Sequence, residues 1–123
     1  MLAGTYNLIA EQGSSFLLVI NFKYPDPADP TGETYVAWDL AGYTSRMQIR
    51  RLITDTNFMI ELTTENNGVE LETGETGEIR LIMTPTQTAA LESNGVYDLE
   101  IIDGAEVNKV ISGDFTLIPE VTR

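Results

Sequence analysis

The chain has 123 residues, with 19 Asp and Glu against 7 Lys and Arg, a formal net charge of −12, and neither Cys nor His. It therefore lacks the groups for a disulfide, a zinc or haem ligand set, a thiol nucleophile or a Ser-His-Asp triad, and we expect no cofactor. The negative charge repels a phosphate backbone, so nucleic acid is not an expected partner. Neither a run of 18 apolar residues nor a signal-peptide pattern is present, so we expect one soluble domain over 1–123 without membrane contact.

Two strands are predicted at the start of the chain, because apolar and polar side chains alternate there. The first covers 6–10 and ends at the turn signal Gln12-Gly13. The second covers 16–22, where Phe, Leu, Ile and Phe recur at every other position.

The alternation stops between 23 and 38. Pro25, Pro27 and Pro30 remove backbone donors and fix φ, so this stretch is not a central strand. We interpret 23–38 as a long loop rich in proline and acidic residues, with a short edge strand around 35–37.

The segment 43–50 predicts a strand with one buried and one solvent-exposed face, because Met47 and Ile49 alternate with Arg46 and Arg50. The same pattern predicts three more strands, at 58–63, 69–71 and 79–83. Between the first two of these, Asn67-Gly68 is the dipeptide best suited to a type I′ turn.

One helical turn is predicted over 85–91, since Thr84-Pro85 is a favourable helix start. Two long strands follow, over 96–103 and 106–118, the second with a bulge expected at Gly113. Seven or eight short antiparallel strands predict an all-β fold, a two-sheet β-sandwich with Greek-key order.

Tyr97 lies at the start of the next-to-last strand. Immunoglobulin-like folds often have a tyrosine corner there, in which the hydroxyl bonds to backbone a few residues upstream. A merely buried aromatic side chain is the alternative, and the sequence does not decide between the two.

The acidic residues are the first candidates for chemistry. No two carboxylates have the spacing of a glycosidase pair or an EF-hand loop, so we expect no enzymatic activity. Asp26 and Asp29 lie in the proline-rich loop, and four glutamates surround one turn: Glu70, Glu72, Glu75 and Glu78. Glu70 and Glu72 share a strand face, so weak calcium binding stays open beside a purely solvated surface.

Three of the seven cations, Arg46, Arg50 and Arg51, fall on or just after one strand. Arg46 and Arg50 point to the same face, where their guanidinium groups can bind carboxylates. The partners are either acidic residues of this acidic chain or those of another subunit.

Aromatic side chains bracket the 23–38 loop: Tyr24, Tyr35, Trp38 and Tyr43. Trp38 can close the end of the core, contribute to a protein interface, or stack with Tyr24 and Tyr35 against a sugar ring. We rank the core role first, the interface second and carbohydrate binding third.

Three blocks of the chain form a recognisable set: GTYNL at 4–8 with EQG at 11–13 and Phe16, DLAGYTSRMQIR at 39–50, and PEVTR at 119–123. Between them, IELTT at 60–64, TGEI at 76–79, TAAL at 88–91, YDLE at 97–100 and GDF at 113–115 fit the same pattern. Together these segments resemble a family of small virion proteins of tailed bacteriophages and prophages, and they are similar to the amino-terminal domain of phage baseplate upper proteins. Family members pass quickly from the second strand to the block that begins at Asp39. In this chain a segment rich in proline and acidic residues, 24–38, is inserted between them.

The resemblance implies an immunoglobulin-like β-sandwich without catalytic residues, acting as a structural protein of the virion, in the tail or baseplate. Expected partners are other virion proteins and copies of itself, in the particle and in the host cytoplasm during assembly. Alternatives are a carbohydrate- or host-surface-binding module and a head decoration protein. The interface candidates are Tyr24, Tyr35, Trp38, Arg46, Arg50, Arg51, Glu120 and Arg123, with Gly4–Ala10 and Pro119–Arg123 as assembly arms.

Overall fold

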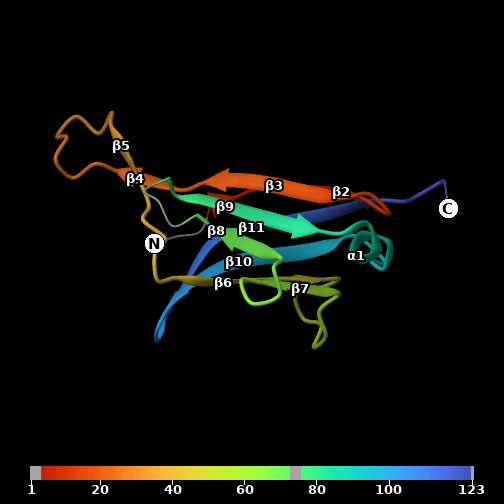
Figure 1. The fold of residues 1–123 in the computed structure, drawn as a ribbon. Coiled ribbons are helices and arrows are strands. Elements are labelled where there is room, and N and C mark those ends of the chain that lie inside the picture. Colours follow the sequence, from red (N-terminus) through yellow and green to blue (C-terminus); the bar gives the residue numbers. More distant parts are fainter. Residues whose placement is uncertain (1–3, 73–75, 123) are drawn as a thin grey trace.

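The chain folds as two β-layers with a hairpin that projects from one end (Figure 1). This computed structural model describes residues 4–72 and 76–122. Strands dominate these residues and helix is confined to one short segment of them, so the all-β prediction is confirmed. In chain order the elements are β1 (Gly4–Thr5), β2 (Leu8–Glu11), β3 (Phe16–Asn21), β4 (Lys23–Pro25), β5 (Tyr35–Ala37), β6 (Thr44–Arg50), β7 (Ile60–Thr63), β8 (Val69–Leu71), β9 (Glu78–Met83), α1 (Pro85–Ala89), β10 (Gly95–Asp103) and β11 (Glu106–Ile118).

The larger layer is a six-stranded sheet in the order β1-β11-β10-β6-β7, with β2 following β1 along the same edge of β11. Both β1 and β2 run parallel to β11, and the other pairs of this sheet are antiparallel. The second layer is an antiparallel sheet in the order β3-β9-β8. The remaining strands, β4 and β5, pair only with each other and form the projecting hairpin.

The core lies between the two layers and is built by alternate side chains of their strands. On β6, Met47 and Ile49 are buried while Arg46 is exposed, which confirms the predicted alternation. Burying one large aliphatic side chain completely stabilises a fold by about 1.5–3 kcal/mol. The residues that are at most 1% exposed include Leu8, Leu40, Met47, Ile49, Leu62, Ile79, Leu81, Met83, Leu99, Ile101 and Phe115.

The helical turn begins as predicted. Thr84 caps α1: its hydroxyl accepts a hydrogen bond from the Gln87 backbone N–H at 3.1 Å, and the Gln87 side chain accepts one from Thr84 N–H at 2.8 Å. This reciprocal pair satisfies backbone donors that a helix start leaves without a partner.

The strand number differs from the prediction: the described residues contain eleven segments rather than seven or eight. The first predicted strand, 6–10, is observed as β2 over 8–11, and the additional short strand β1 precedes it. The segment 23–38 is a hairpin rather than a long loop. The expected strand at 35–37 is confirmed as β5. Its partner β4 was expected to be loop, because Pro25 is a poor strand residue, but Pro25 is tolerated at the end of a two-stranded hairpin.

The type I′ turn at Asn67-Gly68 was a wrong prediction. Such a turn needs a positive φ at both central residues, and only Asn67 has one, at 65°. The flanking strands β7 and β8 belong to different sheets, so the chain crosses between the layers here instead of forming a hairpin. Gly68 is buried, and a side chain there would collide with Leu62.

The bulge in the last strand was also misplaced. The register of β10 and β11 shifts between the pairs Leu99–Ile111 and Glu100–Lys109, so the extra residue is Val110 rather than Gly113. Gly113 has another role, because a Cβ at this position would strike the Tyr6 carbonyl oxygen.

Tyr97 bonds to backbone, but not as a tyrosine corner. Its hydroxyl donates to the carbonyl oxygen of Tyr6 at 2.5 Å, so it holds the N-terminal segment rather than a residue just upstream in its own strand. Burial of the phenol raises the pKa of Tyr97 to about 12, with the nearby Tyr6 adding to the effect.

We expect this phenol to titrate separately from an ordinary tyrosine. The unfolded chain ionises Tyr97 near pH 10.0 and the folded chain near pH 12, so the free energy of unfolding should stay level below pH 10.0 and fall as the pH rises through this window. Phenolate absorbance during a rapid pH titration measures the effect. In Tyr97→Phe the late absorbance step should vanish; if that step persists, it belongs to another tyrosine.

Candidate binding surfaces

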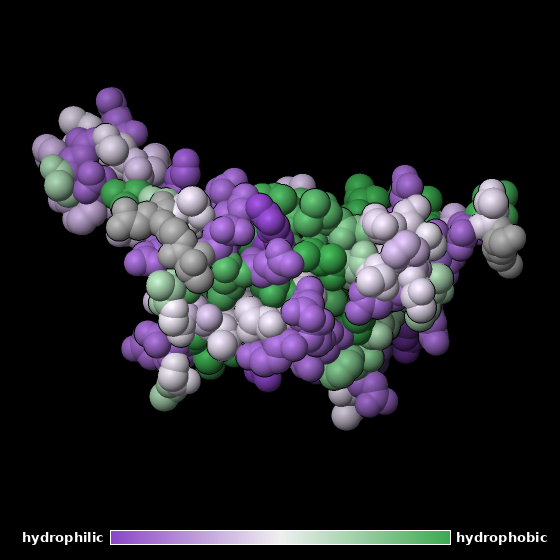
Figure 2. Space-filling model, viewed as in Figure 1, coloured by the Kyte–Doolittle hydropathy of each residue, from purple (hydrophilic) through white to green (hydrophobic). Residues whose placement is uncertain are grey.

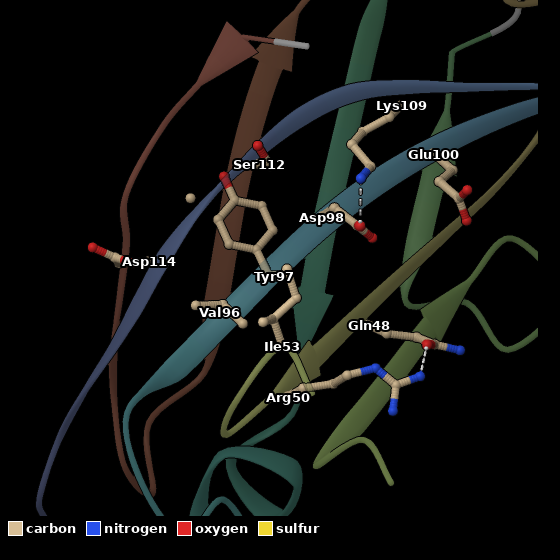
Figure 3. Close-up of a pocket in the computed structure, with 11 residues that line it drawn as sticks. Gln48, Arg50, Ile53, Val96, Tyr97, Asp98, Glu100, Lys109, Ser112 and Asp114 are labelled. Carbon is tan, nitrogen blue, oxygen red and sulfur yellow. Dashed lines mark hydrogen bonds and ion pairs between the residues drawn. The ribbon is translucent and has the colours of Figure 1, made fainter. Parts of the chain in front are cut away.

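A groove of about 570 Å³ lies on the outer face of the larger sheet, over β6, β10 and β11 (Figure 3). Gln48, Asp98 and Ser112 are cross-strand neighbours in this groove. The ammonium of Lys109 lies 3.2 Å from a carboxylate oxygen of Asp98. The groove therefore offers ion pairs and hydrogen bonds for noncovalent contact.

The three predicted arginines contact groups of their own chain. Arg46 lies 3.4 Å from the Glu100 carboxylate, and Arg51 lies 3.5 Å from that of Asp55. The Arg50 guanidinium donates to the Gln48 side-chain oxygen at 2.7 Å and to the carbonyl oxygens of residues 55 and 56. Arg50 thus fastens the loop after β6 to the outer face of the sheet. Their role at an interface stays a prediction.

The predicted aromatic residues divide between the two faces of the hairpin. In the β4–β5 register Tyr24 is opposite Val36, whereas Tyr35 is opposite Pro25, so Tyr24 and Tyr35 lie on opposite faces. The ring centroids of Tyr24 and Trp38 are 6.3 Å apart with the planes at 83°, an edge-to-face pair. Trp38 is partly buried against the core, whereas Tyr35 is 58% exposed.

A second hollow, of about 560 Å³, lies beside this aromatic pair. Its lining combines three aromatic and three polar side chains from segments far apart in the sequence. They are Tyr24, Trp38, Asp39, Tyr43, Glu106 and Asn108. The sequence indicated the aromatic members, but Glu106 and Asn108 could not be assigned to them without the fold.

The acidic loop of the hairpin is organised by Asp29. Its carboxylate accepts hydrogen bonds from the Thr31 backbone and hydroxyl, at 2.9 and 2.7 Å, and from the Thr34 backbone at 2.9 Å. Hydrogen bonds from Thr34 and Thr31 hold the pKa of Asp29 well below its usual range. The Asp29 carboxylate therefore closes the loop.

Arg80, which was not among the predicted site residues, lies within the acidic turn. The Arg80 guanidinium lies 3.0 Å from the carboxylate of Glu78 and 3.8 Å from those of Glu70 and Glu72. It occupies the space between these acids, and the fourth glutamate, Glu75, lies outside the described residues. No cluster of three or more acidic side chains suited to a metal ion is found within 4–72 and 76–122.

We predict that Arg80→Ala lowers the free energy of unfolding by about 1 kcal/mol at low ionic strength, because three carboxylates are left facing one another. The loss should shrink in 1 M salt, where charges are screened within about 3 Å. Urea unfolding at the two salt concentrations measures it. Arg46→Ala, which removes a cation beside one carboxylate, is the control, and an equal salt dependence in both variants would contradict the prediction.

The two predicted assembly arms contact the rest of the chain to different extents, and their role in assembly stays a prediction. Residues 4–5 and 8–11 are paired with β11 and form the edge of the larger sheet. The Glu120 backbone N–H donates to the Gln12 side-chain oxygen at 3.1 Å, which ties the C-terminal segment to the turn before β3. Arg123 lies outside the described residues.

The longest unpaired strand edge belongs to β3. It is the outer strand of its sheet, six residues long, and within the described chain no strand pairs with its other side. Leu17 and Val19 are 64% and 43% exposed, and hydrophobic side chains gather over β3 and β9 in Figure 2. Between β2 and β3 runs a groove of about 300 Å³ whose lining includes Tyr6 and Ile9.

The chain matches no protein-family model and no curated protein. The assignment of function therefore depends on these surfaces and on the sequence resemblance. In the described part of the chain, no helix is both long and apolar enough to cross a membrane.

Proposed function

We propose that the chain is a non-enzymatic structural protein of a tailed-bacteriophage virion, placed in the tail or baseplate, that acts by assembling with neighbouring subunits. The observation that carries this proposal is the open edge of β3. The resemblance of the segments at 4–8, 39–50 and 119–123 to virion proteins adds the biological setting.

We also assign the fold to the immunoglobulin-like class. Three features support this assignment: the sheet β3-β9-β8, the facing series β7-β6-β10-β11, and the parallel addition of β2 to β11. The changes of layer between β2 and β3, between β7 and β8, and between β9 and β10 support the proposed Greek-key order.

The β3 edge lacks the usual protection against pairing. Natural edges are blocked by charged residues, proline, bulges or short strands, because unpaired N–H and C=O groups bind any available strand. No charged residue occurs from Gln12 to Phe22, in a chain that is 21% charged. The other outer strands of the two layers are shorter: β2, β7 and β8 have four, four and three residues and each carries a glutamate, and β1 has two residues.

The occupant that fits this edge is an extended strand of a neighbouring virion subunit. Backbone hydrogen bonds would add it to the sheet, and its alternate side chains would pack on apolar surface, as in β-augmentation. Ile9 and Leu17, 61% and 64% exposed on the two sides of the β2–β3 groove, supply that surface. A charged side chain would lose its hydration on packing against this apolar surface. The edge therefore favours partner strands without charged residues.

The test compares two variants by light scattering coupled to size-exclusion chromatography, alone and with the other virion proteins. Leu17→Lys with Val19→Lys places charge on the edge and should weaken association at least about tenfold. Val107→Lys is the control, because Val107 is a similarly exposed aliphatic residue, 51%, that lies beside the β10–β11 turn and does not line the β2–β3 groove. Absence of association by the unaltered chain, or equal loss in the control, would overturn the proposal.

Location in the particle needs a separate measurement. Mass spectrometry of purified virions should find the chain, and gold-labelled antibody should decorate the tail or baseplate. Label over the head instead would replace the tail assignment with the decoration alternative, which uses the same sandwich and edge.

A further inference from the structure

The hollow beside Trp38 lies at one end of the sandwich, where the core opens to solvent. On β11 the inward positions change character at this point. Phe115 and Ile111 are buried in the core, whereas Asn108, which is opposite the buried Ile101, lines the hollow together with Glu106. Along β11, polar side chains therefore replace apolar ones on the inner face where the hollow begins.

The aromatic wall of the hollow comes from the hairpin and the segment after it. Trp38 packs against the core, and Tyr24, 41% exposed, meets it edge to face. In such a pair the ring that presents its edge keeps both of its faces clear of its partner. Tyr43, the residue just before β6, contributes a third ring.

The charges around the hollow select against anions. Two carboxylates, Asp39 and Glu106, line it, and no Lys or Arg of residues 4–72 and 76–122 is among the lining residues. A hydrogen bond of 3.0 Å from the Ala41 backbone N–H fixes the orientation of the Asp39 carboxylate. Two carboxylates and the Asn108 amide supply acceptors for hydroxyl groups, and the amide also supplies a donor.

We propose that this hollow binds a neutral sugar unit of a glycan. An aromatic face covers the apolar face of a pyranose ring, while carboxylate and amide groups bond its hydroxyls, and a volume of about 560 Å³ lies within the range of small-molecule sites. Acidic sugars are excluded because their carboxylates would meet Asp39 and Glu106. The site is separate from the β3 edge, so it does not depend on the assembly proposal.

The experiment titrates the full chain with methyl glycosides of glucose, galactose, mannose and N-acetylglucosamine, and with sialic acid. Trp38 is the sole tryptophan, so its emission reports contact at the site directly. We expect a saturable change with at least one neutral glycoside and none with sialic acid. Tyr24→Ala and Asn108→Ala should each weaken binding about tenfold.

Tyr35→Ala is the matched control. It removes a tyrosine from the opposite face of the same hairpin and should leave the affinity unchanged. Circular dichroism verifies that each variant is folded, and amide chemical shifts of isotope-labelled protein give a second readout that does not depend on Trp38. A choline titration separates the alternative in which the rings bind an organic cation. Response to choline without any sugar, equal loss in Tyr35→Ala, or no response to any neutral glycoside would overturn the proposal.

Discussion

Gly77→Ala should lower the free energy of unfolding by about 3 kcal/mol or more. Gly77 has a φ of +63°, which costs a residue with a side chain about 1 kcal/mol. In addition, a Cβ there would strike the carbonyl oxygen of Phe22 and come within 3.0 Å of the Trp38 backbone nitrogen. These two atoms form a hydrogen bond of 3.0 Å that joins the base of the hairpin, so the substitution adds a steric and a hydrogen-bond cost to the strain.

Urea unfolding followed by tryptophan emission measures this loss. Gly42→Ala is the matched control: Gly42 also has a positive φ, +82°, but the space around its missing Cβ is open. Gly42→Ala should lower the free energy of unfolding by only about 1 kcal/mol, the cost of the left-handed backbone conformation for a residue with a side chain. Equal losses in the two variants would mean that Gly77 is required only for its φ and not for the approach of Phe22 and Trp38.

Strand positions could be predicted from the sequence because side-chain alternation is a local property. The last strand was predicted over 106–118 and is observed over the same residues, and Met47 and Ile49 are buried as expected. The helix start at Thr84-Pro85 was predictable for the same reason, since capping depends on four consecutive residues. Each of these predictions needed no knowledge of a distant partner.

The failed predictions concern residues whose roles depend on how the chain folds back on itself. Gly113 resembles a bulge residue, but it is small because the distant Tyr6 carbonyl approaches it. Gly68 resembles a turn residue, but it is small because the chain brings it against the side chain of Leu62 on the preceding strand. Likewise, the hydroxyl of Tyr97 bonds 91 positions away along the chain. Local patterns carry no information about such approaches.

For the candidate surfaces, the sequence predicted residues that lie close together along the chain but not those that the fold brings together. Tyr24 and Trp38 could be proposed together because they flank one loop, but only the hairpin register places Tyr35 on the other face. Glu106 and Asn108 are about seventy positions from Trp38 along the sequence, so nothing local joins them to the aromatic pair. The open edge of β3 also depended on strand order, which alternation does not specify.

Thr88→Val should lower the free energy of unfolding by about 2 kcal/mol, although the two side chains have nearly the same shape. Thr88 on α1 is fully buried, and its hydroxyl accepts from the Gly13 backbone N–H at 3.0 Å and donates to the Ser14 carbonyl at 2.8 Å. Valine leaves both backbone groups without this partner, and an unsatisfied polar group costs about 1–3 kcal/mol where water cannot replace the bond.

The measurement pairs chemical unfolding with hydrogen exchange at the Gly13 amide. Thr88→Ser keeps the hydroxyl and should preserve exchange protection at Gly13 while losing only about 1 kcal/mol for the missing methyl group. Because the turn at 12–15 leads directly into β3, loosening it should also weaken association through the β3 edge. Full protection of Gly13 in Thr88→Val would contradict the assignment of Thr88 as the group that holds this turn, and with it the expected effect of α1 on the association proposed for the β3 edge.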